Sequence, residues 1–357
     1  MRLIDLGWND ELGRGFEAWK ATPHVQPGRV AIEFNYLYRV YVEGGEIEAM
    51  LAGRLKHHAR GRSDLPAVGD WIVLRRRPDE DRGVVVGVLP RRSRFSRRMA
   101  GRITGEQVVA ANVDVVLITM GLDGDFNVRR LERYLLLGRE SGARPAILLT
   151  KPDLAPDLDA QAAAVRALAG DVPVHVVGPK RGEGLEPVRA MLAPGLTGAL
   201  LGSSGVGKTT IINRLVGDES RRTREVRASD DRGRHTTTRR ELVVLPGGGL
   251  LIDTPGMREL QLWEGGDSVR DTFEDVDALA RSCRFSDCRH RQEPRCAVKA
   301  AVSEGRLAAD RLASYLKLQN ELDFVARQQD ERAHIEEKRR GRVMAKALEQ
   351  HLKTKGR

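Results

Sequence analysis

The stretch Gly202-Ser203-Ser204-Gly205-Val206-Gly207-Lys208-Thr209 matches G-x-x-x-x-G-K-[ST], the pattern of a phosphate-binding loop. It follows an apolar stretch at 198–201 and precedes a helical pattern at 208–216, which is the strand–loop–helix context that this loop needs. Glycines let backbone N–H groups turn towards phosphate oxygens, and the positive end of the following helix attracts the same anion. We therefore expect nucleotide phosphates to bind along this loop as far as Thr210. Lys208 would reach the β- and γ-phosphates and assist catalysis.

A second motif, Asp253-Thr254-Pro255-Gly256, follows the apolar run at 250–252. A carboxylate at such a strand end can hold Mg²⁺ opposite the phosphate-binding loop, whose Thr209 hydroxyl would supply another ligand. The N–H of Gly256 would then contact the γ-phosphate. These positions predict a magnesium site formed by Thr209 and Asp253.

The base is expected to bind at Thr150-Lys151-Pro152-Asp153, which follows the apolar stretch 146–149 and resembles the [NT]-K-x-D motif. The Asp153 carboxylate can accept hydrogen bonds from guanine N1–H and N2–H₂. Adenine cannot supply that pair, so it would leave the carboxylate unmatched. The stem of Lys151 would lie over the base. The motif predicts a preference for GTP over ATP.

The order of these motifs along the chain is unusual. The base-reading motif at 150 comes first, followed by a candidate base-closing loop at 177–179, the phosphate-binding loop at 202 and Asp253. This is a circular permutation of the usual order, which a sheet with neighbouring termini tolerates. Alternating strand and helix patterns over 106–262 predict a doubly wound α/β domain around these motifs.

The segment Gly233-Arg234-His235-Thr236-Thr237-Thr238 lies where a switch loop is expected. One of Thr236, Thr237 and Thr238 is expected to ligate Mg²⁺ when the γ-phosphate is present. Met257 stands where Ras-like enzymes place a water-orienting Gln, and a thioether cannot orient water by hydrogen bonding. We expect His235 to position the attacking water. An exposed loop histidine without a catalytic role is the alternative.

All three cysteines of the chain lie in one short segment, and a histidine lies among them. An odd number of cysteines argues against disulfides, and their clustering favours a metal. Three thiolates and one imidazole form a closed tetrahedral set typical of structural Zn²⁺. The predicted ligands are Cys283, Cys288, His290 and Cys296. They lie in a helical region, 263–357, that ends in a basic, charged tail.

The N-terminal region divides into an extension at 1–28 and a β-rich part at 29–105. Five short strand patterns within 29–90 predict a small barrel, either an OB-fold or an SH3-like barrel. The Arg-rich stretch 91–105 is expected to be a basic linker or an arm that contacts phosphates.

Composition limits the partners and the compartment. The 357 residues carry a formal net charge of +10, which suits a polyphosphate ligand such as RNA. No apolar run approaches the roughly 20 residues of a membrane span, and the residues from Met1 onward lack the apolar stretch and the small-residue cleavage site expected of a signal peptide. We expect a cytoplasmic, monomeric protein with no membrane partner.

The phosphate-binding loop, Gly233 to Thr238, Asp253 to Gly256 and the Cys₃His cluster together resemble the RsgA family of ribosome-small-subunit-dependent GTPases. The resemblance covers nearly the whole chain. It implies a multi-domain fold with an N-terminal OB-fold, a circularly permuted P-loop GTPase domain and a C-terminal zinc-binding helical domain. It also implies GTP hydrolysis stimulated by the 30S subunit, contact with 16S rRNA, and a role in late subunit maturation. An apolar residue at Met257 is usual in this family.

Two alternatives stay open. The chain could be a GTPase or GTP-gated factor acting on another RNA such as tRNA, or an RNA-binding scaffold whose hydrolysis is incidental. Stimulation of turnover by 30S subunits, compared with tRNA, separates them.

Overall fold

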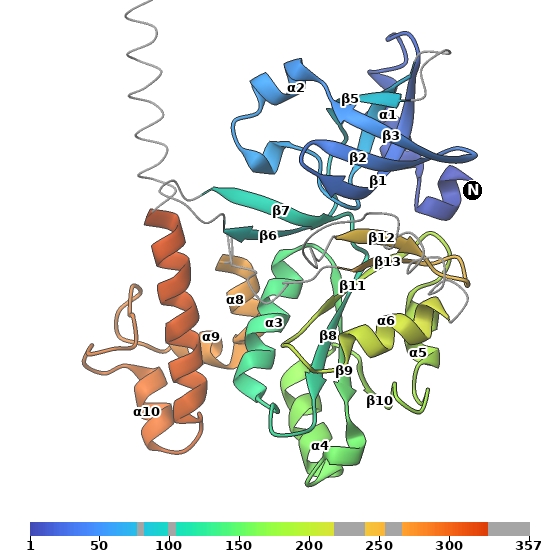
Figure 1. Ribbon diagram of the computed structural model, residues 1–357. Coiled ribbons are helices and arrows are strands. Elements are labelled where there is room, and N and C mark those ends of the chain that lie inside the picture. Colours follow the sequence, from blue (N-terminus) through green and yellow to red (C-terminus); the bar gives the residue numbers. More distant parts are fainter. Residues whose placement is uncertain (77–81, 99–104, 218–239, 254–265, 328–357) are drawn as a thin grey trace, which may run out of the picture. The chain divides into compact units, whose positions relative to one another are not determined.

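The computed structural model describes residues 1–76, 82–98, 105–217, 240–253 and 266–327. The chain forms two compact units, Met1–Gln261 and Leu262–Arg357. The first unit contains a barrel and an α/β sheet, and the second is helical (Figure 1). Expected elements that fall at 218–239, 254–265 and 328–357 lie outside the described residues.

Five strands form the barrel at the N-terminal end: β1 (Val25–Phe34), β2 (Leu37–Val42), β3 (Gly45–Leu51), β4 (Trp71–Arg75) and β5 (Arg82–Val88). Alternating side chains of β2 and β3 point inward, because successive residues of a strand face opposite sides. The core includes Tyr38, Val40, Val42, Ile47 and Ala49. Because buried and exposed residues alternate with a period of two along β2 and β3, these segments fold as strands with one buried face.

The strand order is β1-β2-β3-β5-β4, and β4 pairs back with β1 to close the barrel. β3 and β5 run parallel, and the short helix α2 (Gly53–His58) lies between β3 and β4 in the chain. The prediction of an OB-fold is confirmed. Strand β1 begins at Val25, within the stretch 1–28 that we expected to be an extension. That stretch also contains η1 (Leu3–Leu6) and α1 (Asp10–Glu17).

The basic stretch 91–105 differs from the expected linker. Residues Arg94–Arg98 form strand β6, which pairs antiparallel with β7 (Glu106–Ala111). Phe95 of β6 is buried, whereas Arg94 is exposed. The strand therefore anchors one apolar side chain although most of its residues are polar or charged.

A mostly parallel sheet forms the centre of the first unit, in the order β10-β9-β8-β11-β13-β12. Its strands are β8 (Val115–Gly121), β9 (Arg144–Thr150), β10 (Val174–Val177), β11 (Thr197–Leu201), β12 (Glu241–Val244) and β13 (Leu250–Asp253). Only β12 runs antiparallel to its sheet neighbour β13; the other pairs are parallel. The strand β11 that leads into the phosphate-binding loop lies in the middle, although it follows β8, β9 and β10 in sequence. The permuted order is confirmed.

Helices cover both faces of this sheet. The helices α5 (Glu186–Met191) and α6 (Lys208–Val216) pack on the face that carries Val115 and Leu117. Helix α3 (Val128–Glu140) lies on the opposite face, where its Gly138 approaches Val116 and Ile118. Helix α4 (Leu158–Ala169) packs beside α3 and β10. Because alternate residues of β8 face both layers, the strand is buried along its whole length. The doubly wound prediction is confirmed.

The barrel joins the sheet through strand β1. Ile32 of β1 pairs with Glu241 of β12, and Tyr41 donates a hydrogen bond to the carbonyl of Leu242 at 3.1 Å. A bulge at the Val30/Ile32 step bends β1, so that its first half pairs with β4 and its end reaches β12. The barrel and the nucleotide-binding sheet thus form one continuous eleven-stranded sheet.

A buried arginine strengthens this junction. The Arg29 guanidinium donates to the carbonyls of Leu6, Gly69 (3.2 Å) and Asn112 (3.0 Å). Burial lowers the pKa of Arg29 to about 10, so the side chain stays charged at neutral pH. One side chain therefore links the N-terminal turn, the barrel and the start of the sheet.

The second unit contains α8 (Gly266–Thr272), α9 (Glu274–Ala280), α10 (Ala297–Ser303) and a helix at 309–327. Phe273 is fully buried between α8 and α9, and its ring meets Tyr315 edge-on at 5.5 Å. Arg311 stacks over Phe273 and pairs with Asp275 at 2.9 Å. These contacts attach the helix at 309–327 to the segment that precedes the cysteines. Among the described residues of the chain, none of the helices has the length and apolar character to span a membrane.

Candidate nucleotide site and metal cluster

A pocket of about 740 Å³ opens at the carboxyl end of the parallel strands. It brings together the base-reading motif, the expected base-closing loop and the phosphate-binding loop, which are far apart in sequence. Its lining residues are Thr150, Lys151, Pro152, Asp153, Leu154, Gly178, Pro179, Lys180, Arg181, Glu183, Gly205, Val206, Gly207 and Thr210. Ligands of open α/β sheets bind at this edge, outside the carboxyl ends of the strands.

Thr150 links the base-reading loop to the phosphate-binding loop. Its buried hydroxyl donates to the carbonyl of Val206 at 2.6 Å and lies 3.3 Å from the carbonyl of Met120. Lys151 follows with a φ of 56°, in the left-handed region, and turns the chain into the short helix η3 (Pro152–Leu154). The side chain of Asp153 is exposed beside the pocket. The carboxylate is therefore free to face a base.

The phosphate-binding loop is formed by backbone conformations that only glycine adopts easily. Gly207 has a φ of +99° and is the N-cap of α6. A Cβ on Gly202 would lie 2.3 Å from the carbonyl oxygen of Thr119, so no larger residue fits there. The Lys208 ammonium donates to the carbonyls of Gly202 at 2.8 Å and Ser203 at 2.5 Å. The lysine thus lies folded across its own loop.

Asp253 ends strand β13, which runs parallel to β11. Because the carboxyl ends of parallel neighbours share one edge, its half-buried carboxylate lies at the same edge as the loop that begins at Gly202. Thr209 is exposed in the first turn of α6. The remaining predicted residues, His235, Thr236, Thr237, Thr238 and Gly256, lie outside the described residues.

Sequence analysis missed three residues that brace the pocket. Lys151 donates to Asp123 at 2.6 Å, and Ser203 donates to Asp125. Arg214 of α6 donates to the carbonyl of Pro179 at 3.0 Å and so holds the base-closing loop. Asp123 and Asp125 come within five residues of the end of the apolar strand 113–120, and that position at a carboxyl strand end was the available signal.

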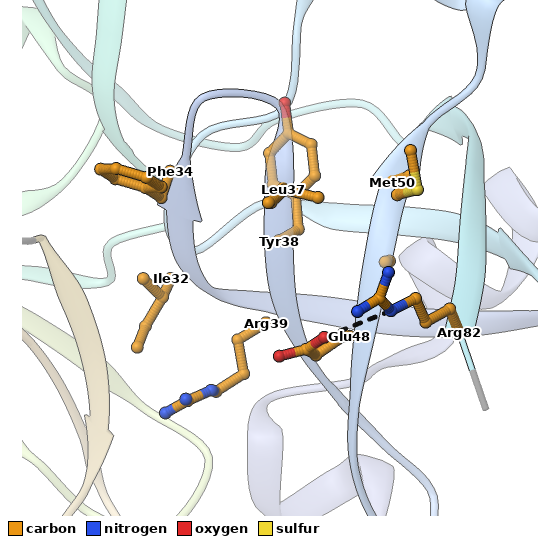
Figure 2. A pocket seen from close by; sticks show the side chains of 9 residues that line it. Ile32, Phe34, Leu37, Tyr38, Arg39, Glu48, Met50 and Arg82 are labelled. Atoms are coloured by element: carbon orange, nitrogen blue, oxygen red, sulfur yellow. Dashed lines mark ion pairs between the residues drawn. The ribbon is translucent and has the colours of Figure 1, made fainter. Parts of the chain in front are cut away.

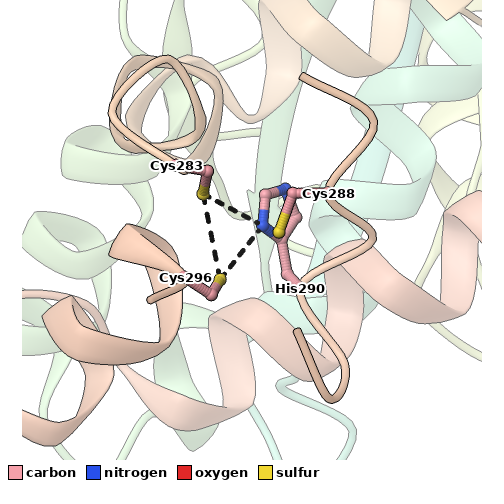
Figure 3. A group of neighbouring side chains, drawn as sticks. All are labelled: Cys283, Cys288, His290 and Cys296. Atoms are coloured by element: carbon pink, nitrogen blue, oxygen red, sulfur yellow. Dashed lines mark hydrogen bonds between the residues drawn. The ribbon is translucent and has the colours of Figure 1, made fainter. Parts of the chain in front are cut away.

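The four predicted metal ligands come together in the second unit. Their donor atoms all lie within 4.8 Å of one another (Figure 3). His290 Nδ1 lies 3.7 Å from Cys283 Sγ and 3.4 Å from Cys296 Sγ, and the two sulfurs are 3.9 Å apart. A tetrahedral Zn²⁺ with bonds of about 2.3 Å to sulfur and about 2.0 Å to nitrogen separates its ligands by roughly 3.5–3.8 Å. The geometry and donor set fit such an ion.

Without a metal, local electrostatics favour the metal-binding protonation state at His290 and Cys283 but not at Cys288. Burial lowers the pKa of His290, which keeps its imidazole neutral. Burial alone would raise the pKa of the Cys283 thiol, but hydrogen bonds from the backbone N–H groups of Val298 and Ala297, and from the thiols of Cys288 and Cys296, together lower that pKa. Burial and the neighbouring thiols raise the pKa of Cys288 to about 11. Crowded thiolates repel one another, and a cation would remove that repulsion.

Comparisons with known proteins agree with this geometry. The sequence profile of the family described as RsgA GTPase matches residues 88–263. A Small ribosomal subunit biogenesis GTPase RsgA from Opitutus terrae is 47% identical over 92% of this chain and 92% of its own. One from Leptospira interrogans is 39% identical over 99% of this chain and 98% of its own. The chain belongs to the RsgA GTPase family.

Solved structures of similar proteins have the same fold as this RsgA-family chain. YjeQ from Thermotoga maritima superposes with a TM-score of 0.60 and 27% identity, covering 84% of this chain and 98% of that one. YloQ, described as a circularly permuted GTPase, gives a TM-score of 0.56 at 24% identity over 85% of this chain and 97% of its own. At that identity the second likeness concerns the fold alone.

The barrel of this RsgA-family chain carries a shallow apolar hollow on the outer face of β1, β2 and β3 (Figure 2). Phe34, Leu37 and Met50 are each 44–50% exposed there, which is unusual for large apolar side chains. Arg82 pairs with Glu48 at 3.5 Å at its rim. Near the same end of β1, Lys56 lies over the ring of Tyr36 at 4.1 Å. The face combines apolar contact area with cations.

Proposed function

We propose that this protein hydrolyses GTP on the 30S ribosomal subunit during late maturation of that subunit. The observation that carries the proposal is the pocket in which Thr150–Asp153 and Gly205–Thr210 lie together, in a chain whose relatives are named small ribosomal subunit biogenesis GTPases. A base reader and a phosphate binder that share one pocket support recognition of a whole nucleotide. Subunit assembly takes place in the cytoplasm, and we place the protein there as a monomer.

We assign the nucleotide contacts as follows. Asp153 accepts from guanine N1–H and N2–H₂, and the stem of Lys151 covers the base. Lys208 leaves the carbonyls of its own loop and binds the β- and γ-phosphates. Thr209 and Asp253 hold Mg²⁺, with one switch threonine at Thr236, Thr237 or Thr238. The exposed Asp153 and the loop-folded Lys208 support these roles.

The attacking water needs a positioning group, because Met257 cannot orient it. We assign that role to His235, and the N–H of Gly256 to the γ-phosphate. We expect a low basal rate without the subunit, since the chain lacks the glutamine that commonly orients the attacking water.

We propose that RNA binds both the loop of the metal cluster and the OB-fold barrel. Five arginines surround the metal cluster, and all five are exposed: Arg281, Arg284, Arg289, Arg291 and Arg295. Zn²⁺ bound by Cys283, Cys288, His290 and Cys296 would fix the loop that carries them. The apolar and cationic face of the OB-fold barrel supports contact with 16S rRNA, because such faces bind oligonucleotides.

The main experiment measures GTP turnover with purified 30S subunits, with tRNA and with no RNA, at several salt concentrations. We expect 30S subunits, but not tRNA, to stimulate GTP turnover strongly. This stimulation should fall steeply as the salt concentration rises, because phosphate contacts are lost. Equal stimulation by tRNA would favour the alternative partner. A chain that binds 30S subunits without any increase in turnover would instead favour an RNA-binding scaffold.

Guanine recognition is tested separately with Asp153→Asn. An asparagine offers one acceptor and one donor, which match N1–H and the C2 carbonyl of xanthine rather than guanine. We expect the variant to lose GDP affinity by at least tenfold and to gain affinity for xanthosine diphosphate. The exposed Asp159 of α4 provides the control, because Asp159→Asn makes the same chemical change away from the pocket. Unchanged GDP binding by Asp153→Asn would refute the assignment.

A further inference from the structure

The turn between β8 and α3, residues 121–127, contacts two separate parts of the nucleotide pocket. Its Asp123 accepts a hydrogen bond from the Lys151 ammonium at 2.6 Å, and its Asp125 accepts one from Ser203. Lys151 belongs to the base-reading motif, whereas Ser203 belongs to the phosphate-binding loop. A single turn therefore braces both halves of the site.

The Asp123 carboxylate is held in place independently of Lys151. Strand β8 pairs with β9 so that Gly121 lies opposite Thr150, and Leu122 N–H donates to the carbonyl of Thr150 at 2.9 Å. Within the turn, the N–H of Asp125 donates to the Asp123 carboxylate at 3.2 Å. The strand register thus places the carboxylate beside the base-reading loop before any ligand binds.

The other side of the turn is fixed by helix α3. Arg130 of α3 donates to Asp125 at 2.7 Å, while Ser203 donates to the second oxygen of the same carboxylate. The side-chain oxygen of Asn127 caps the helix by accepting from the N–H of Arg130 at 2.9 Å. The turn is therefore anchored at both ends, and it can act as a fixed support for a mobile side chain.

Lys151 benefits from such a support. A free lysine side chain samples many rotamers, and fixing it costs up to about 2 kcal/mol. The ion pair with Asp123 has side chains only 24% and 22% exposed, so solvent screens it less than a surface pair. The hydrogen bond from Lys151 also holds the pKa of Asp123 below its usual range, so the carboxylate is charged at neutral pH.

We propose that Asp123 is a positioning residue for the nucleotide, which holds the Lys151 side chain ready to cover the base. The proposal rests on the proposed reading of guanine by Thr150–Asp153. Asp123 does not touch the nucleotide in this role. It acts through Lys151 and reduces the rotamer freedom that the lysine loses on binding.

A double-mutant cycle tests the proposal. Asp123→Asn keeps an oxygen for the Asp125 N–H but removes the charge that attracts Lys151. We expect it to weaken binding of a fluorescent GDP analogue about three- to tenfold, mainly through faster dissociation. In a Lys151→Ala background the same substitution should change the affinity by less than about twofold. Asp159→Asn in α4 serves as the matched control, and thermal melting without nucleotide checks that each variant folds.

The outcomes separate the two claims. A loss of affinity that is equally large with and without Lys151 would show that Asp123 only supports the turn, and would overturn the proposal. The proposal would also be overturned if the Asp123→Asn variant bound GDP as tightly as the unmodified chain. If the unmodified chain binds ADP as tightly as GDP, guanine reading itself fails. If the effects of Asp123→Asn and Lys151→Ala are still coupled in that case, Asp123 positions Lys151 for nucleotide binding although the protein does not distinguish the bases.

Discussion

Thr150 shows how one hydroxyl can connect two motifs. Its donation to the Val206 carbonyl is buried, so removing the hydroxyl leaves that carbonyl unpaired. We expect Thr150→Val to lower the free energy of unfolding by about 1–2 kcal/mol and to weaken GDP binding severalfold. Urea denaturation with and without GDP measures both effects.

Thr197 provides the matched comparison. It is equally buried, but its hydroxyl has no hydrogen-bond partner within the described part of the chain. Thr197→Val should therefore leave GDP binding unchanged and leave stability equal or raise it by up to about 1 kcal/mol. A loss of stability as large as that of Thr150→Val would contradict the role given to the Val206 contact.

The residues of the site divide into those that sequence can identify and those that it cannot. The phosphate-binding loop and the metal ligands are local patterns whose spacing reflects their chemistry. The position of Asp123 after a strand marks it as a candidate, but neither Asp123 nor Arg214 has a motif that names its partner, because Lys151 and Pro179 are brought near only by the strand register and by the packing of α6. Predicting them requires the tertiary structure.

Among the elements, the junction between barrel and sheet depends on Arg29. Replacing it with Met would leave the carbonyls of Leu6 and Asn112 without this donor, while the Gly69 carbonyl would keep only its hydrogen bond from the Asn112 side chain. We expect Arg29→Met to lower the free energy of unfolding by about 3 kcal/mol. The exposed Arg54 of α2 is the control, since Arg54→Met should change stability by less than about 0.5 kcal/mol. Equal effects of the two substitutions in urea denaturation would exclude the bridging role.

Strand β6 shows where pattern reading fails at this scale. Three of its residues, Arg94, Arg97 and Arg98, are arginines, and the stretch therefore resembles a linker. Its partner β7 supplies the pairing, and Phe95 supplies the buried contact. Barrel strands β2 and β3 were predictable because their alternation extends over six or seven residues. A short, charged strand without such alternation is recognised only through its partner.

At the level of the whole molecule, the two compact units should respond differently to loss of metal. Cys296 is the N-cap of α10 and one of the four clustered ligands. We expect Cys296→Ser to lose bound Zn²⁺ and the protection of amide hydrogens over 274–327, while GDP affinity changes by less than about twofold. Metal analysis, hydrogen exchange and nucleotide titration measure these three quantities.

The exposed Ser286 in the same loop supplies the control. Ser286→Ala should keep both the metal and the protection of the helices. Retention of full protection by Cys296→Ser after complete loss of metal would show that the second unit folds without an ion.

The domain order was predictable from sequence, whereas the continuous sheet that joins barrel and nucleotide site was not, because its link is one short pairing between β1 and β12.

The central position of β11 also matters while the chain is being synthesised. Strands β8, β9 and β10 leave the ribosome first and can pair with one another, but one edge of β8 stays open until β11 has emerged. The barrel closes on itself much earlier, through β4 and β1. A nascent chain therefore carries a finished barrel beside a half-built sheet with an unprotected edge. Slow translation after β10 has emerged and before β11 emerges would prolong that aggregation-prone interval, and chaperone contacts should concentrate there.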